Sequence, residues 1–168
     1  MAYLPPQDKD IECAVLGACM IFADALEKVA DILTIECFYD VANRHIYSSM
    51  YELYRENKPV DILTVKNRLV EKNQLTNVGG AYYLSELTSR VASAVNVDYH
   101  ARILVEHFLK REIIRLSYEN IQTAFDNSSD VFDIYQKSVQ KIEGALTGVI
   151  KYEVSDIGKI HSELIAES

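Results

Sequence analysis

Apolar residues recur along most of the chain at intervals of three and four, the spacing of helices with one buried face. Alternating β-branched residues that would indicate a strand are not found, and only three prolines and six glycines interrupt the pattern. The sequence therefore predicts an all-α protein. We expect a compact head of about five or six short helices in residues 1–95, a long antiparallel helical hairpin over 96–148, and a linker helix within 149–168.

Helix-end signals divide the predicted head. Asp8 and Asp61 stand where side chains could cap helices, and the segment Asn57–Pro59 is expected to stop a helix over 41–56. A short helix over 25–33 comes before it, and Gly79-Gly80 precedes another that carries Tyr83. Helix 41–56 is predicted to carry one apolar face, which consists of Ile46, Met50, Leu53 and Tyr54.

From Asn96 to about Asp126 nothing breaks the helical pattern, so about thirty residues would form a rod of roughly 45 Å. Two apolar stripes run along it: one holds Ile103, Ile114, Ile121 and Phe125, the other Leu109, Ile113 and Leu116. A polar turn over 126–130, with a cap at Ser129 or Asp130, leads into a second helix that ends near Leu146. The head alone cannot cover both stripes, so we expect a partner helix and a second copy of the chain.

The last residues, 149–168, have a different character. After an extended stretch, Ser155 or Asp156 is expected to cap a final helix with Ile157, Ile160 and Leu164 on one side. This helix has no core of its own, which predicts a linker that docks elsewhere. A frayed terminus that binds nothing is the alternative.

Composition and charge narrow the class of protein. Hydrophobic residues make up 49% of the chain, enough for a buried core, but no apolar run approaches the 18 residues or so of a membrane span. No signal peptide is read at the start. Cys13, Cys19 and Cys37 form no CxxC pair and are interpreted as buried thiols, which favours the reducing cytoplasm.

The net charge of −8 argues against strong nucleic-acid binding, which depends on lysine and arginine. The sequence also lacks the glycine-rich loops that bind phosphates and the HExxH zinc motif. His100 and His107 lie two helical turns apart, but no further ligand is near them in sequence, so a solvated pair is the preferred interpretation. No catalytic residue, metal site or cofactor is predicted for this chain.

Eleven tyrosines stand out, including Tyr82 and Tyr83 after the double glycine. Most are interpreted as core-edge residues with hydroxyls that reach water. Tyr83 is our preferred exception, as part of a protein-binding surface.

Several short motifs occur together in a recognisable order. They are Pro5-Pro6-x-x-x-Asp10-Ile11-Glu12-x-x-Val15-Leu16-Gly17, then Phe38-Tyr39, Pro59-Val60-Asp61, Leu69, Gly79-Gly80 with Tyr83-Leu84, and Asn96, Tyr99, Arg102 and Ile103. Across residues 5–115 this series resembles the N-terminal domain of DnaB-type replicative helicases. Asp10 replaces a usual glutamate, Ile11 a usual alanine, and Asn43 stands where a histidine is common.

The resemblance implies an assembly module. In that family the N-terminal domains pair as a trimer of dimers, forming a collar on a hexameric ring, and the collar receives primase. A separate RecA-like motor domain, which would follow residue 168, uses ATP and Mg, and the linker helix docks on the motor of the neighbouring subunit. We therefore expect an oligomer interface at Ile114, Tyr118, Ile121, Phe125, Val139 and Ile142, a primase surface at Tyr83 and Asp10, and linker docking through Ile157, Ile160 and Leu164.

Three other functions stay open. The first is a free-standing helical adaptor that holds a different partner with its tail. The second is a DNA-binding regulator whose recognition helix would be Asp61–Lys72, with Lys66, Arg68 and Lys72 as its basic residues. The third is an enzyme of unrecognised type, which no group of residues in the sequence supports.

Overall fold

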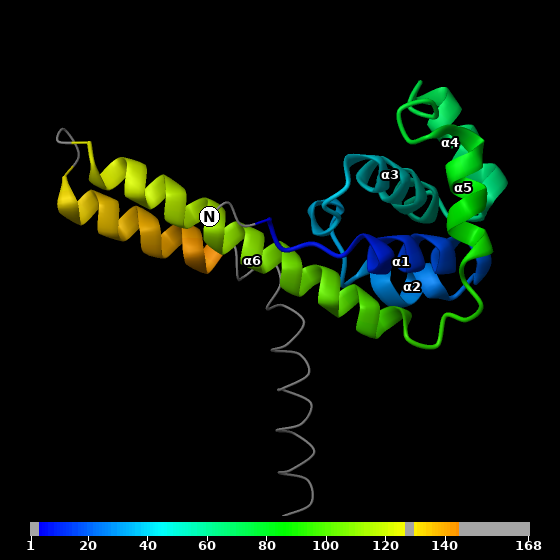
Figure 1. Cartoon of the computed structure of the whole chain (residues 1–168), viewed down its shortest axis with the longest axis horizontal. Coiled ribbons are helices and arrows are strands. Elements are labelled where there is room, and N and C mark those ends of the chain that lie inside the picture. The colour runs from blue at the N-terminus through cyan, green and yellow to red at the C-terminus, as the bar shows by residue number, and fades with distance from the viewer. Residues whose placement is uncertain (1–3, 127–129, 145–168) are drawn as a thin grey trace, which may run out of the picture. The chain divides into compact units, whose positions relative to one another are not determined.

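The computed structural model describes residues 4–126 and 130–144, which are helical and without strands, so the predicted all-α class is confirmed (Figure 1). The elements are α1 (Lys9–Ile21), α2 (Ala25–Ala30), a 3₁₀ turn η1 (Ile35–Cys37), α3 (Val41–Arg55), α4 (Ile62–Glu71), α5 (Gly80–Ser89), α6 (Val97–Ala124) and a second hairpin helix over 131–144. They form two compact units, which divide within α6 after Phe108.

The caps predicted at Asp8 and Asp61 are present, whereas the one predicted at Ser155 or Asp156 lies outside the described residues. The Asp8 carboxylate accepts a hydrogen bond from the backbone N–H of Ile11 at 3.0 Å, and Asp61 forms a reciprocal capping box with Thr64. Asp130 is one of the two residues predicted to cap the second hairpin helix. Its carboxylate accepts a hydrogen bond from the backbone N–H of Phe132 at 2.8 Å. Asn57 adopts a left-handed φ of 55° just after α3, where the sequence predicted a stop.

Two local features of the head differ from the sequence prediction. Helix α2 ends at Ala30 rather than near residue 33, and a closing turn follows in which the N–H groups of Ile32 and Leu33 share the carbonyl of Val29. The turn η1 was not predicted. On the predicted apolar face of α3, Ile46, Met50 and Leu53 are buried and Tyr54 is 38% exposed at its edge. Tyr47, two turns before Tyr54, is only 1% exposed and packs on Phe38. Tyr54 lies beyond that core, at the end of the helix, with its ring next to Tyr51.

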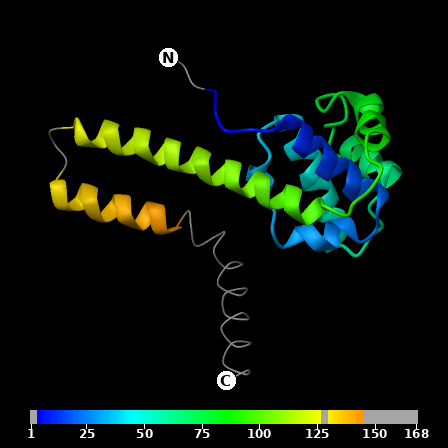
Figure 2. The same cartoon turned by 60° about the horizontal axis from the view of Figure 1, so that its bottom comes forward.

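Unit 1 is the head. Within it α1 packs against α2, α3 and α5, while α4 packs against α3 and α5 (Figure 2). The first turns of α6 belong to this core because Val97, Ala101 and Leu104 are buried there. The packed unit that contains the head therefore continues to Phe108, past the predicted end of the head at residue 95.

At Gly17, α1 packs closely against α5. A Cβ atom at this position would lie 2.2 Å from the carbonyl oxygen of Leu87 on α5. Only a residue without a side chain permits this contact, which explains the glycine of the first motif.

Cys13, Cys19 and Cys37 are buried free thiols, as expected. Burial raises the pKa of Cys19 to about 12, so this thiol is unreactive at neutral pH. None of the described helices is long and apolar enough to cross a membrane.

Candidate functional site

The hairpin of unit 2 carries one continuous apolar face on α6. Ile114, Tyr118, Ile121 and Phe125 follow one another at intervals of four, three and four residues, so their side chains lie along one side of the helix. They are 44%, 67%, 53% and 83% exposed. We call these four residues the outer face. Scattered apolar residues are ordinary on a protein surface, but four large ones in a row indicate a contact surface.

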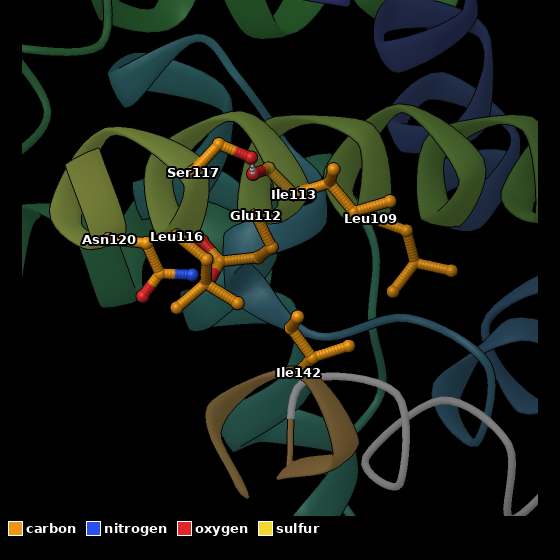
Figure 3. Close-up of a pocket in the computed structure, with 7 residues that line it drawn as sticks. All are labelled: Leu109, Glu112, Ile113, Leu116, Ser117, Asn120 and Ile142. Atoms are coloured by element: carbon orange, nitrogen blue, oxygen red, sulfur yellow. Dashed lines mark hydrogen bonds between the residues drawn. The ribbon is translucent and has the colours of Figure 1, made fainter. Parts of the chain in front are cut away.

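The opposite side of α6 faces the second helix. Leu116 and Asn120 lie roughly half a turn (about 180°) from the outer face, at 3.6 residues per turn. Here the two helices leave a groove of about 250 Å³, shown in Figure 3, into which Ile142 points from the second helix. Its lining consists of Leu109, Glu112, Ile113, Leu116, Ser117, Asn120 and Ile142.

Polar contacts join the two hairpin helices. The Ser138 hydroxyl donates to the side-chain oxygen of Asn120 at 2.9 Å, and Lys141 pairs with Glu119 at 2.9 Å. The carboxylate of Glu119 also pairs with Arg115, and these cations hold the pKa of Glu119 below its usual value. All of these charges lie near the surface, where an ion pair contributes little stability.

The six predicted interface residues do not lie on one face. Four form the outer face of α6, whereas Ile142 lines the groove on the other side of that helix. Val139 on the second helix is half-exposed. Phe132 and Tyr135, also on the second helix, were not among the six, although they are 80% and 72% exposed.

The two residues predicted for a partner surface on the head have different environments. Asp10 is exposed in the first turn of α1. Tyr83 is half-buried: its hydroxyl donates to the side-chain oxygen of Asn43 at 2.9 Å and lies 3.5 Å from the sulfur of Cys13. Burial, followed by the contact with Cys13, raises the pKa of Tyr83. The neighbouring Tyr82 is 79% exposed.

Behind Tyr83 lies a buried polar network that the sequence did not reveal. The carboxylate of Glu12, which is 1% exposed, accepts hydrogen bonds from the backbone N–H groups of Tyr39 and Asp40 and from the side-chain amide of Asn43. Asn43 in turn accepts from Tyr83. The network ties α1, α3 and α5 together beneath the predicted partner surface. The only sequence signal was the glutamate and the Phe38-Tyr39 pair within the motifs.

Helix α4 is the recognition helix in the alternative of a DNA-binding regulator, and two of its basic side chains pair with carboxylates of α3. Arg68 pairs with Glu52 and Glu56, and Lys72 pairs with Glu52. Hydrogen bonds from Arg68 and then Lys58 hold the pKa of Glu56 at about 2. Two of the three basic residues of the supposed recognition helix are thus committed to the head, which does not favour a DNA-binding regulator.

Among the described residues, no group of three or more His, Cys, Asp or Glu side chains is arranged to hold a metal ion. The predicted docking residues Ile157, Ile160 and Leu164, together with the extended stretch before them, lie outside the described residues.

Comparison with known proteins gives three kinds of match. Residues 4–106 match the family described as DnaB-like helicase N terminal domain. The chain is 42% identical over 131 residues to the replicative DNA helicase DnaB of Rhodothermus marinus, covering 78% of this chain and 14% of that protein. It is 35% identical over 139 residues to DnaB of Geobacillus stearothermophilus, covering 83% of this chain and 31% of that protein. The chain thus spans less than a third of these relatives.

Two solved structures share the fold. The crystal structure of the N-terminal domain of DnaB helicase from Mycobacterium tuberculosis matches with a TM-score of 0.79 and 31% identity, over 84% of this chain and 99% of that one. A structure described as a DnaB-like replicative helicase and its interactions with primase matches with a TM-score of 0.72 and 27% identity, over 92% of this chain and 36% of that one.

Proposed function

The chain belongs to the DnaB-like helicase N-terminal domain family, and we propose that it is the assembly and docking collar of a replicative DNA helicase. The observation that carries this proposal is the outer face of α6, whose four large apolar side chains are 44–83% exposed in a single chain. A surface of this kind is covered when a second copy binds. In the proposed assembly two hairpins form a dimer, and three such dimers form the hexameric collar.

A collar dimer would be isologous, with the same patch on both subunits. The outer face of each α6 would then meet the hairpin of the other copy. Val139 and Ile142 on the second helix would contribute, together with Phe132 and Tyr135, which are exposed on the same helix. Core residues of such interfaces are typically aromatic and aliphatic, as these are.

The head would receive primase. A relative of the same fold is described with its interactions with primase, and this chain presents the exposed Asp10 at the start of α1 and the half-buried Tyr83 on α5. The network of Glu12 and Asn43 would hold Tyr83 in position.

Catalysis would belong to the remainder of the parent protein. The sequence of 168 residues contains no glycine-rich phosphate-binding motif. The relatives are three to seven times longer than the matched segment, as their coverage of 31% and 14% indicates. ATP and Mg would act in that motor domain, in the cytoplasm. Ile157, Ile160 and Leu164 would link this chain to the motor of the neighbouring subunit.

The proposal is tested by the solution mass of the chain, measured by light scattering over a wide range of concentration. We expect the mass to rise above that of a single 19.1 kDa chain toward a dimer or a higher multiple of it. A mass that stays at one chain at the highest concentration contradicts the assembly role.

A further inference from the structure

The hairpin closes with very little buried surface. Of the side chains from Leu109 to Asp126, only Leu116 is buried, and none of the described side chains of 130–144 is. The groove of about 250 Å³ remains open between the helices, with Ile113 on its edge 57% exposed. Packed protein interiors leave few voids of this size, so the contact between these two helices is incomplete in one chain.

Little else holds the second helix in place. The Ser138–Asn120 hydrogen bond is only partly buried, and the Lys141–Glu119 pair is exposed on both sides. Isolated helices shorter than about 12–15 residues are marginal in water, and the described helix 131–144 is of that size. Its stability therefore depends on tertiary packing that a single chain supplies only in part.

We propose that closure of the hairpin is coupled to self-association: the helix 131–144 packs stably on α6 when a second copy covers both helices, and is largely undocked in a single chain. This rests on the proposed function, because the second copy is the one that the collar would supply. Exposed residues on both helices, such as Ile121 on α6 and Phe132 on the second, would be buried together in the dimer. A partner that binds the closed form alone must draw the equilibrium toward it.

The coupling raises the chain concentration that is needed for hairpins to pair. When most single chains are open, both copies must close to form the dimer, so the apparent dissociation constant is weakened by the square of the closed fraction. A closed fraction of about one in ten then weakens association about a hundredfold. Hairpins would then remain unpaired in dilute chains and become ordered as the ring assembles.

The first test is hydrogen exchange on the unmodified chain at several concentrations, with the mass measured on the same samples. We expect the amides of 131–144 to exchange rapidly in dilute, single chains and to become protected in step with the rise in mass, while the head stays protected throughout. Protection of 131–144 in single chains overturns the coupling. If the mass also rises in that case, the proposed function stands without it.

The second test locks the hairpin. An Asn120→Cys/Ser138→Cys pair replaces a contact already made between the helices, and the native thiols are buried in the head. We expect the oxidised form to associate with a dissociation constant about a hundredfold lower than that of its reduced form, which is the matched control. Equal constants overturn the coupling alone, whereas a single-chain mass for both forms overturns the proposed function and the coupling together.

Discussion

The side-chain amide of Asn43 on α3 donates a hydrogen bond of 2.8 Å to the carboxylate of Glu12 on α1, and both residues are fully buried. A buried carboxylate is costly unless its oxygens are satisfied. The two backbone N–H groups at the start of α3 and the Asn43 amide together meet that need. The pair therefore fixes the relative position of α1 and α3.

Asn43→Ala removes this donor and leaves the Tyr83 hydroxyl without its acceptor. We expect the free energy of unfolding to fall by about 1–3 kcal/mol, measured by urea denaturation. Asn67→Ala, at an exposed position of α4, is the control and is expected to have little effect. Equal stability of the two variants contradicts the structural role of the network.

Gly17→Ala tests the close approach of α1 and α5. Alanine favours helices over glycine by up to about 1 kcal/mol, but its Cβ would meet the Leu87 carbonyl, which cannot move without its helix. Strain from overpacking is expected to win, with a net loss of about 1–3 kcal/mol and a lower melting temperature. Gly144→Ala, where a Cβ would meet nothing within 4 Å, should leave the melting temperature unchanged or slightly raised. A Gly17→Ala chain as stable as the original would refute this packing argument.

Some of these features could be predicted from the sequence and others could not. Caps such as Asp8 and Asp61 are readable because their partners lie two or three residues away. Glu12 looks like a surface glutamate, since the groups that satisfy it lie 27 to 31 residues further on. The outer face of α6 was visible as a stripe, whereas sequence spacing did not show that Ile142 points into the groove between the two hairpin helices.

Acid should weaken the head through Glu56. Its pKa in the folded chain is about 2, against an ordinary 4.5, because Arg68 and then Lys58 donate to it. The stabilisation is complete above pH 4.5 and is lost as the pH falls from 4.5 toward 2. Glu56→Gln should therefore show a shallower loss of stability than the original chain in this range, followed by urea unfolding at several pH values. Parallel curves would show that the pair adds nothing to stability.

Tyr83→Ala is expected to weaken binding of the C-terminal domain of primase, measured by calorimetry, because it removes a half-buried ring from the proposed docking surface. Tyr83→Phe keeps the ring and loses only the hydrogen bond to Asn43. Comparing it with Tyr83→Ala separates the contact of the ring with primase from the role of the hydroxyl in holding the ring in place. Tyr82→Ala probes the exposed neighbour. An affinity that Tyr83→Ala leaves unaltered dismisses Tyr83 as a contact.

The outer face of α6 offers a matched comparison for the central claim. Ile114 and Ile121 are seven residues apart and exposed on α6, and Leu63 and Val70 are seven residues apart and exposed on α4 of the head. Glutamate at either pair adds the same charge to an exposed helix face. Only the pair on α6 lies on the proposed interface.

The most direct measurement is sedimentation equilibrium of Ile114→Glu/Ile121→Glu beside Leu63→Glu/Val70→Glu and the original chain, at one concentration where the original is associated. We predict that the α6 variant sediments as a single chain with an intact melting transition, while the α4 variant keeps the mass of the original. An α6 variant that retains the associated mass would contradict the assignment of this face to the contact between copies.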